Sequence, residues 1–207
     1  MNGQDTRDLR LERETLFVRK VAFENRTFAG LTPELRTVIQ KLQRNLRFFR
    51  NMREDEALLF LRFSRSKTFD EGETLTCPAE GGDCLCLLVT GEIIFQANGG
   101  KAFQIEPGVV FGTISLARGA TARAGKNALI FYIDRDILRR NMPSLTAKYD
   151  MCPFGIRSKE GGHLCFDPAA GKFFQPQPEL LRSFCKWENG FQPCPHYRSF
   201  KQANKPA

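Results

Sequence analysis

The sequence predicts a mainly β protein with flanking helices, built as a β-jelly-roll barrel with N-terminal helices and a small cysteine-rich tail. Short β-type runs, most of them followed by glycine or proline, recur between residues 68 and 133. Apolar residues at helical spacing precede these runs, and four of the seven cysteines follow them. We therefore expect a basic helical segment over residues 1–45, a barrel over 46–142 and a tail over 143–207.

The composition is typical of a soluble protein. The 207 residues are 42% hydrophobic and 26% charged, which is enough for a core with an ordinary polar surface. No apolar run approaches the length of a membrane span, and residues 1–5 lack the basic and then apolar pattern of a secretion signal. We expect a cytoplasmic location and no membrane partner.

The net charge of +8 belongs to the two flanks of the chain. Residues 1–50 carry a net +5, residues 51–151 a net −1 and residues 152–207 a net +4. Basic flanks can contact nucleic acid, anionic lipid or an acidic partner, although a solvated surface is the commoner explanation. We favour the solvated surface, and nucleic-acid binding is the weaker alternative.

Helices are predicted ahead of the barrel. Residues 1–24 read as a helix with a broken amphipathic pattern. Residues 32–50 form a better one, because Thr32 can cap it and Pro33 suits its first position. We expect its apolar face to pack on the barrel, and residues 53–63 to form a further short helix. That face is one stripe at helical spacing: Leu35, Val38, Ile39, Leu42, Leu46 and Phe49.

The β region consists of short apolar runs divided by turn residues. Turns are expected at residues 70–73 and 78–83, and Thr90 with Gly91 separates two of the runs. Residues 97–101 carry a hairpin signal. The expected strands cover residues 85–89, 92–96, 102–105, 109–111, 121–124 and 128–133.

A short helix should close the barrel. Asp134 is placed to cap a helix over residues 135–142. Pro143 and the polar residues that follow it should end the helical pattern. Three further cysteines lie in the strand-like apolar text, where we expect small buried hydrophobic residues: Cys77, Cys84 and Cys86.

Residues 111–124 carry the clearest indication of a binding site. Phe111 and Gly112 end an apolar run, an apolar turn follows, and Arg118 then stands beside residues with small side chains or none. Small residues let backbone N–H groups approach a ligand closely, a short helical turn offers its positive end, and an arginine adds a charged donor. The segment is therefore expected to cradle an anion.

This segment resembles the phosphate-binding cassette of cyclic-nucleotide-binding domains, whose usual form is Phe-Gly-Glu, an apolar turn and then Arg-(small)-Ala-Thr-Val-x-Ala. The match consists of Phe111-Gly112 at its start and Arg118-Gly119-Ala120-Thr121-Ala122-x-Ala124 at its end. The resemblance covers about residues 46–142 and implies a catabolite-activator-type effector barrel. Four more motifs in the same order also resemble the family: Phe69-x-x-Gly72-Glu73, Gly82-Asp83-x-Leu85-x-Leu87-x-x-x-Gly91-Glu92-Ile93, Pro107-Gly108 and Tyr132-Ile133-Asp134-Arg135-Asp136-Ile137-Leu138.

The resemblance implies a regulatory protein with a cyclic nucleotide as its ligand. Arg118 would pair with the phosphate, and Thr113 would contact the ribose through its hydroxyl. Thr113 stands where the family keeps a glutamate, the turn before Arg118 is shortened, and no long lid helix or helix-turn-helix follows the barrel. We therefore expect conventional cAMP binding to be weak or absent. The ligand residues implied are Gly112, Thr113, Arg118, Gly119, Ala120 and Thr121.

The tail is organised by four cysteines spaced as Cys152-x12-Cys165-x19-Cys185-x8-Cys194. Its glycines and prolines leave little room for regular structure, and so small a segment needs a staple. Four thiolates suit tetrahedral zinc or an iron–sulfur cluster, while cysteines packed without metal are a third interpretation. Two residues could replace a ligand or support one from outside, His163 and His196.

An enzyme is not expected. The sequence contains no phosphate-binding loop of nucleotide hydrolases, no dinucleotide fingerprint and no His-Glu-x-x-His motif. The two histidines both lie in the tail, which removes most arrangements of nucleophile and base. Two functions are left open. The first is a regulatory protein whose barrel binds a small anionic ligand, and the second is a scaffold that binds a partner protein through a metal-held tail.

Overall fold

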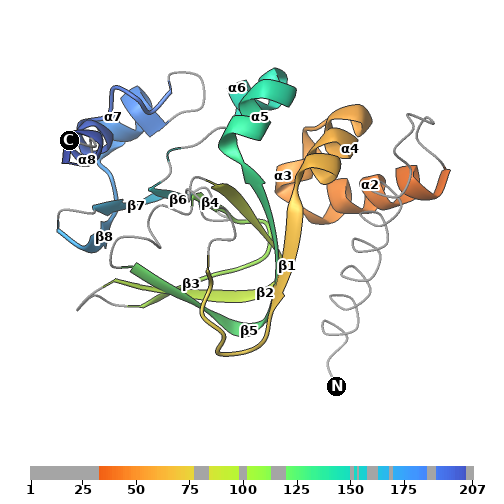
Figure 1. Cartoon of the computed structure of the whole chain (residues 1–207), viewed down its shortest axis with the longest axis horizontal. Helices are drawn as coiled ribbons and strands as arrows, with labels where there is room; N and C mark the ends of the chain where they lie inside the picture. The colour runs from red at the N-terminus through yellow and green to blue at the C-terminus, as the bar shows by residue number, and fades with distance from the viewer. Residues whose placement is uncertain are drawn as a thin grey trace.

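The computed structural model describes residues 33–76, 84–97, 102–112, 120–149, 152, 154–157, 163–167, 170–185 and 190–203. Figure 1 shows the helices that precede the sheet gathered at one side of it, and the helices of the tail at the other. The helix predicted over residues 1–24, Thr32 and Cys77 lie outside the described residues. Among the ranges given above, the helices are too short or too polar to cross a membrane.

The helices ahead of the sheet confirm the sequence prediction, with one interruption. They are α2 (Pro33–Asn45), α3 (Arg47–Arg50) and α4 (Glu54–Phe63). The segment predicted as one helix is divided at Leu46, whose backbone is extended at φ −115 and ψ 117. Leu46 is nevertheless buried. Phe48 and Phe49 of α3 are buried too, so the apolar face continues across the break.

In the described part of the chain, eight strands form one antiparallel sheet in the order β1-β5-β2-β4-β6-β7-β8, with β3 paired to β2 beside this path. This arrangement, with its flanking helices, confirms the predicted fold class and is consistent with a jelly roll. The strand bounds are β1 (Arg65–Phe69), β2 (Cys84–Ala97), β3 (Phe103–Ile105), β4 (Val110–Gly112), β5 (Ala120–Asp134), β6 (Gly155–Arg157), β7 (His163–Asp167) and β8 (Lys172–Phe174).

β2 and β5 are long bent strands, where the sequence had predicted two short strands each. They pair antiparallel along their whole lengths, with register shifts between Leu88 and Ile93. Gly91 lies at these shifts with φ +79, a conformation that L side chains rarely adopt. A Cβ atom there would overlap the backbone of Asn127 and Ala128 on β5. Thr90 and Gly91 therefore form a β-bulge that bends the pair, instead of a turn that separates two strands.

The central strands are buried on both faces. On β2, Leu85, Leu87 and Val89 face the helices, while Cys84, Cys86 and Leu88 face the interior of the sheet. This explains the unbroken apolar run in the sequence, because a strand covered on both sides needs no polar face. It also bears out the expectation that the described cysteines of the barrel are buried as small apolar residues.

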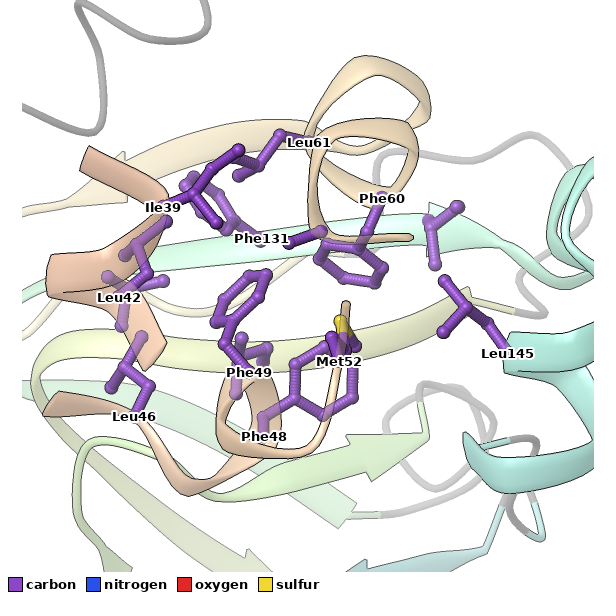
Figure 2. Packing of buried hydrophobic residues seen from close by; sticks show 14 of the residues in the cluster. Ile39, Leu42, Leu46, Phe48, Phe49, Met52, Phe60, Leu61, Phe131 and Leu145 are labelled. Atoms are coloured by element: carbon purple, nitrogen blue, oxygen red, sulfur yellow. The ribbon is translucent and has the colours of Figure 1, made fainter. Parts of the chain in front are cut away.

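An aromatic core joins the helices to the sheet. Figure 2 shows Phe48, Phe49 and Phe60 packed against one another beneath Phe131 of β5. The ring centroids of Phe48 and Phe60 are 5.0 Å apart, and those of Phe49 and Phe60 are 5.5 Å apart, with edge-to-face geometry. The predicted packing of the apolar stripe on the barrel is thus present, and α6 adds Leu145 to the same core.

The short helices α5 (Arg135–Asn141) and α6 (Pro143–Tyr149) follow β5. The predicted cap is present, because the Asp134 carboxylate accepts hydrogen bonds from the backbone N–H groups of Asp136 at 2.7 Å and Ile137 at 3.2 Å. The expectation that Pro143 ends the helical pattern is wrong. Pro143 occupies the first position of α6, where a proline needs no hydrogen-bond partner for its nitrogen.

The tail has more regular structure than its glycine and proline content suggested. Its strands β6, β7 and β8 extend the sheet, since β6 pairs with β4. The helical parts are α7 (Pro178–Leu180), the π-helical turn η2 (Leu181–Cys185) and α8 (Pro195–Ala203). The edge of β4 gives the first tail strand its backbone partners, a long-range effect that local composition does not reveal. The division of the chain into a helical segment over residues 1–45, a barrel over 46–142 and a tail over 143–207 stays a prediction.

Phe173 of β8 connects the tail to the interior of the sheet. Its ring centroid lies 4.8 Å from that of Phe103 and 6.1 Å from that of Phe95. On the tail side it lies 5.1 Å from the ring of Phe166. One side chain thus contacts aromatic residues of β2, β3 and β7, so the tail and the sheet share a continuous apolar interior.

Candidate functional site

The segment predicted to bind an anion connects β4 to β5. Gly112 ends β4 opposite Leu85, and Ala120 begins β5 opposite Ala97. Thr121 follows Ala120 on the same strand. The other three predicted ligand residues lie outside the described residues: Thr113, Arg118 and Gly119.

The bend in β2 brings the two ends of this segment within reach of each other. Leu85 and Ala97, which mark the ends, are twelve residues apart. A straight strand of that length would cover about 40 Å, whereas the eight peptide steps from Gly112 to Ala120 reach at most about 29 Å. β2 therefore cannot be straight between Leu85 and Ala97, in agreement with the register shifts between Leu88 and Ile93.

The strand that leaves the segment has two different faces. Ala120, Ala122 and Ala124 are buried, while Thr121 and Arg123 between them are exposed. The Thr121 hydroxyl donates a hydrogen bond to the backbone oxygen of Gln96 at 3.3 Å. The alanines allow close packing on one face, and Thr121 presents its hydroxyl group on the other.

The buried face of this strand packs against the tail. Ala120 and its partner Ala97 share one apolar cluster with residues from three parts of the tail. The end of the predicted ligand segment thus rests on the cysteine-rich core. The tail members of the cluster are Cys152, Phe154, Phe166, Phe191, Cys194 and Tyr197.

The four predicted metal ligands line one small pocket in the tail, which aromatic side chains and His196 complete. Two of these cysteines also belong to a closer set of donors: the ligand atoms of His163, Cys165 and Cys185 all lie within 4.8 Å of one another. Cys152 and Cys194 face the same pocket outside this closest set. The expected convergence of the cysteines is present, and His163 joins two of them more closely than the other two cysteines do.

A signal for His163 was present in the sequence. His163 and Cys165 are two residues apart on β7, and alternation along a strand places such residues on the same face. The prediction of an irregular tail concealed this spacing, because alternation has meaning only where a strand forms. His163 is 8% exposed, and its Nε2 atom has no hydrogen-bond partner in the described part of the chain.

A hydrogen bond between Cys165 and Cys185 shifts the pKa values of the two thiols in opposite directions. It lowers the pKa of Cys185 to about 5, against the opposing effect of partial burial, and a hydrogen bond and charge from His163 lower it further. The same hydrogen bond, with burial, raises the pKa of Cys165 well above its usual range. Without a metal the pair therefore holds a thiolate at Cys185 and a thiol at Cys165 that donates to it.

The remaining polar groups at the pocket are more weakly connected. Burial raises the pKa of Cys152 to about 12, although the backbone N–H of Phe154 donates to its sulfur and opposes the rise. The Nδ1 atom of His196 lies 3.9 Å from a carboxylate oxygen of Asp167, and its ring centroid lies 4.9 Å from that of Phe174. The pocket thus combines thiol, thiolate and imidazole donors, which are the groups that bind soft and borderline metal ions.

No protein-family profile and no curated protein matches the sequence. Among solved structures, the chain is similar to the cAMP-bound regulatory domain of Toxoplasma gondii PKA, with 19% identity, a TM-score of 0.42, and coverage of 53% of this chain and 46% of that one. It is similar to cAMP-bound PfPKA-R (141–441), with 21% identity, a TM-score of 0.42, and coverage of 53% and 40%.

A third similar structure is the regulatory subunit of a cAMP-independent protein kinase A from Trypanosoma cruzi bound to guanosine. The identity is 16%, the TM-score is 0.40, and the match covers 52% of this chain and 41% of that one. The chain thus spans less than half the length of these three structures.

Proposed function

We propose that this chain is a non-enzymatic regulatory protein whose barrel senses a small anionic ligand. The observation that supports the proposal is the sequence of residues 113–119 together with their described neighbours, Gly112 at the end of β4 and Ala120 at the start of β5. The bend in β2 draws these ends together, and small residues flank them. Arg118 lies within this segment and supplies the positive charge that an anion requires.

A cyclic nucleotide is the ligand class that the sequence motif suggests. Arg118 would pair with its phosphate, and the backbone N–H groups beside Gly119 would add donors. Thr113 offers a hydroxyl where the motif usually has a carboxylate. Loss of a hydrogen bond to a charged group costs about 1.5–3 kcal/mol, or about 10- to 100-fold in affinity, so cAMP should bind weakly.

Calorimetric titration of the full chain with cAMP, cGMP, AMP and guanosine tests the proposal. We expect a phosphate-containing ligand to bind, Arg118→Ala to abolish binding, and Thr113→Glu to strengthen cAMP binding. Arg123→Ala is the matched control, since Arg123 is an exposed arginine on β5 close to the segment. If none of the phosphates binds, or if Arg118→Ala binds them as the unaltered chain does, the sensor proposal is wrong.

The cysteines support a reducing compartment such as the cytoplasm. None of the six described cysteines forms a disulfide, although several of them line one pocket. Disulfides persist in oxidising compartments and are rare where glutathione keeps thiols reduced. The proposed location would be wrong if the protein isolated from its native cells contained disulfides between the pocket cysteines.

A second candidate function is a scaffold that binds a partner protein through a tail held by a metal. The grouping of His163, Cys165 and Cys185 favours it, since these donor atoms suit zinc or, for the cysteines alone, an iron–sulfur cluster. This function requires no small ligand. It predicts that a chelator loosens the tail and that none of the nucleotides raises the melting temperature.

A further inference from the structure

We infer that Cys152, His163, Cys165 and Cys185 form a structural zinc site that fastens the tail beneath the start of β5. This inference rests on the second candidate function, the tail held by a metal, and is independent of the ligand segment. It names the metal and the four ligands, and it replaces Cys194 of the original cysteine set with His163.

The three closest donors already approach the spacing that zinc requires. Zinc binds sulfur at about 2.3 Å and nitrogen at about 2.0–2.1 Å in a tetrahedron, so neighbouring ligand atoms lie about 3.4–3.8 Å apart. The donor atoms of His163, Cys165 and Cys185 lie within 4.8 Å of one another. Small side-chain rotations would therefore bring all three onto one ion without moving the strands.

The fold supplies these donors from elements that hold their backbones. His163 and Cys165 lie on one face of β7, which is paired on both sides, with β6 and with β8. Cys185 is the last residue of the π-helical turn η2, a conformation often found at functional sites. β7 and η2 thus bring three ligands together, although Cys165 and Cys185 are 20 residues apart in the sequence.

Cys152 is the fourth ligand that we propose. It lines the same pocket as Cys165 and Cys185, and the backbone N–H of Phe154 donates to its sulfur. A tight turn holds this arrangement, with the Gly155 N–H donating to the Cys152 oxygen at 2.8 Å. The turn therefore holds the Cys152 sulfur at the pocket with one hydrogen-bond donor already directed at it, as metal ligands commonly have.

The charges around the pocket suit a site of this composition. Three thiolates and a neutral imidazole around Zn²⁺ carry a net charge of about −1, and a buried charge needs compensation. Arg135, which is 1% exposed, acts electrostatically on Cys152, and its guanidinium carbon lies 5.8 Å from the centre of the Phe191 ring. A buried cation therefore stands beside the predicted anionic centre.

His163 distinguishes zinc from an iron–sulfur cluster. Clusters are held in most proteins by four cysteine thiolates, whereas three cysteines with one histidine are a common structural zinc set. His163 is buried, and its Nε2 atom lacks a hydrogen-bond partner within the described ranges. The other ring nitrogen is close to the cysteines, since His163 hydrogen-bonds Cys185.

The test measures metal in the purified full chain by elemental analysis and by Co²⁺ substitution, in which thiolate ligation produces charge-transfer absorption. We expect one zinc per chain. Cys152→Ser, Cys165→Ser, Cys185→Ser and His163→Ala should each weaken zinc affinity by about 100-fold or more, since even residues outside the ligand set cost about 10- to 100-fold. His163→Cys should keep the metal, because four thiolates also bind zinc.

Two controls separate the ligands from other cysteines. Cys86→Ser removes a buried cysteine of the barrel, and Cys194→Ser removes the pocket cysteine outside the proposed set. Both variants should keep one zinc per chain. Absence of metal from the unaltered chain, iron with labile sulfide, or full zinc binding by the Cys165→Ser/Cys185→Ser double variant would overturn the site. Loss of zinc in Cys194→Ser but not in Cys152→Ser would overturn the fourth ligand.

The spectrum of cobalt in the unaltered chain keeps the test decisive if a variant fails to fold. Thiolate charge transfer in that spectrum supports the site, and its absence contradicts it. Arg118→Ala should retain its zinc. Failure of the zinc site would therefore leave the nucleotide titrations unaffected, and failure of the sensor proposal would leave the metal content unaffected.

Discussion

Ala120 lies directly opposite Ala97 in the pairing of β5 with β2, and both residues are buried beneath the tail. Ala120 is also the first described residue after the predicted ligand segment. The tail residues of this apolar cluster therefore pack against the end of that segment. This contact links the two proposed sites physically.

Ala120→Val should separate the tail from the barrel. Added methyl groups in a closely packed cluster cost about 1–3 kcal/mol, because neighbours must move to make room. Urea unfolding should show this loss, and hydrogen exchange should quicken in β7 and α8. Thr121→Val is the control, since Thr121 is exposed, and it should change stability by about 0.5 kcal/mol or less. Equal effects of the two substitutions would contradict the packing described above.

Gly91→Ala should be among the most damaging small substitutions in the barrel. The new Cβ would overlap the backbone of β5, and positive φ adds strain of about 1–3 kcal/mol for a residue other than glycine. We expect a loss of more than about 3 kcal/mol in urea unfolding, or failure to fold.

Gly72→Ala provides the comparison for Gly91→Ala. Gly72 has φ +83, but a Cβ there would meet nothing within 4 Å. Gly72→Ala should therefore lower the free energy of unfolding only by the backbone strain, about 1–2 kcal/mol. If the two variants were equally stable, the bulge would not depend on the close approach at Gly91.

Asp134→Ala should weaken the start of α5. The carboxylate accepts hydrogen bonds from two backbone N–H groups, and loss of such a cap costs about 0.5–2 kcal/mol. Asp136→Ala is the matched control, because its side chain only pairs with exposed Arg139 at 3.4 Å, an interaction worth about 0.3–0.5 kcal/mol. Thermal unfolding should rank Asp134→Ala as the less stable variant, and the reverse order would refute the cap.

In the zinc-free protein, Cys185 should react with iodoacetamide at pH 7. Its pKa of about 5 makes it a thiolate at pH 7, whereas a cysteine at the ordinary value of 9.0 would be almost fully protonated there. Mass spectrometry after brief labelling should find Cys185 modified before Cys152 and Cys165, and zinc should protect it. Preferential labelling of Cys152 would contradict the described hydrogen bonds.

The same shifts set a direction for stability against pH in the zinc-free form. The pKa of Cys185 is lower in the folded state, so its contribution is present above pH 9 and is lost as the pH falls through about 5. The pKa values of Cys152 and Cys165 are raised, so their contributions are present below pH 9 and decline as the pH rises further. These cysteines alone would therefore place the stability maximum near pH 9.

The helices and the fold class could be predicted because their signals are local. The apolar stripe over residues 35–49 predicted the buried face of α2 and α3, and Asp134 predicted the start of α5. From sequence alone, Thr90 and Gly91 read as a break between two strands, because glycine serves turns and bulges alike. Only the partner strand decides between them, and Asn127 of β5 is 36 residues away.

The cysteine pocket was partly predictable, and its closest three donors were not. Four cysteines in a small tail suggested that their side chains gather at one place, and that prediction does not depend on their exact spacing in the sequence. The pairing of His163 with Cys165 depends on β7, and β7 exists because β6 continues the sheet from β4. Local composition cannot report such a long-range support, so the sequence could name His163 only as a possible replacement ligand and could not place it beside Cys165 and Cys185.

The pairing of β6 with β4 has a consequence for the solubility of the barrel. An unpaired strand edge is a template for other chains, and proteins usually cover it. A chain that ended after α6 would leave Val110 and Phe111 on an open edge that Arg157 and Ile156 now occupy. The tail therefore protects the barrel against edge-to-edge aggregation, and an isolated barrel would be expected to form oligomers or fibrils through β4.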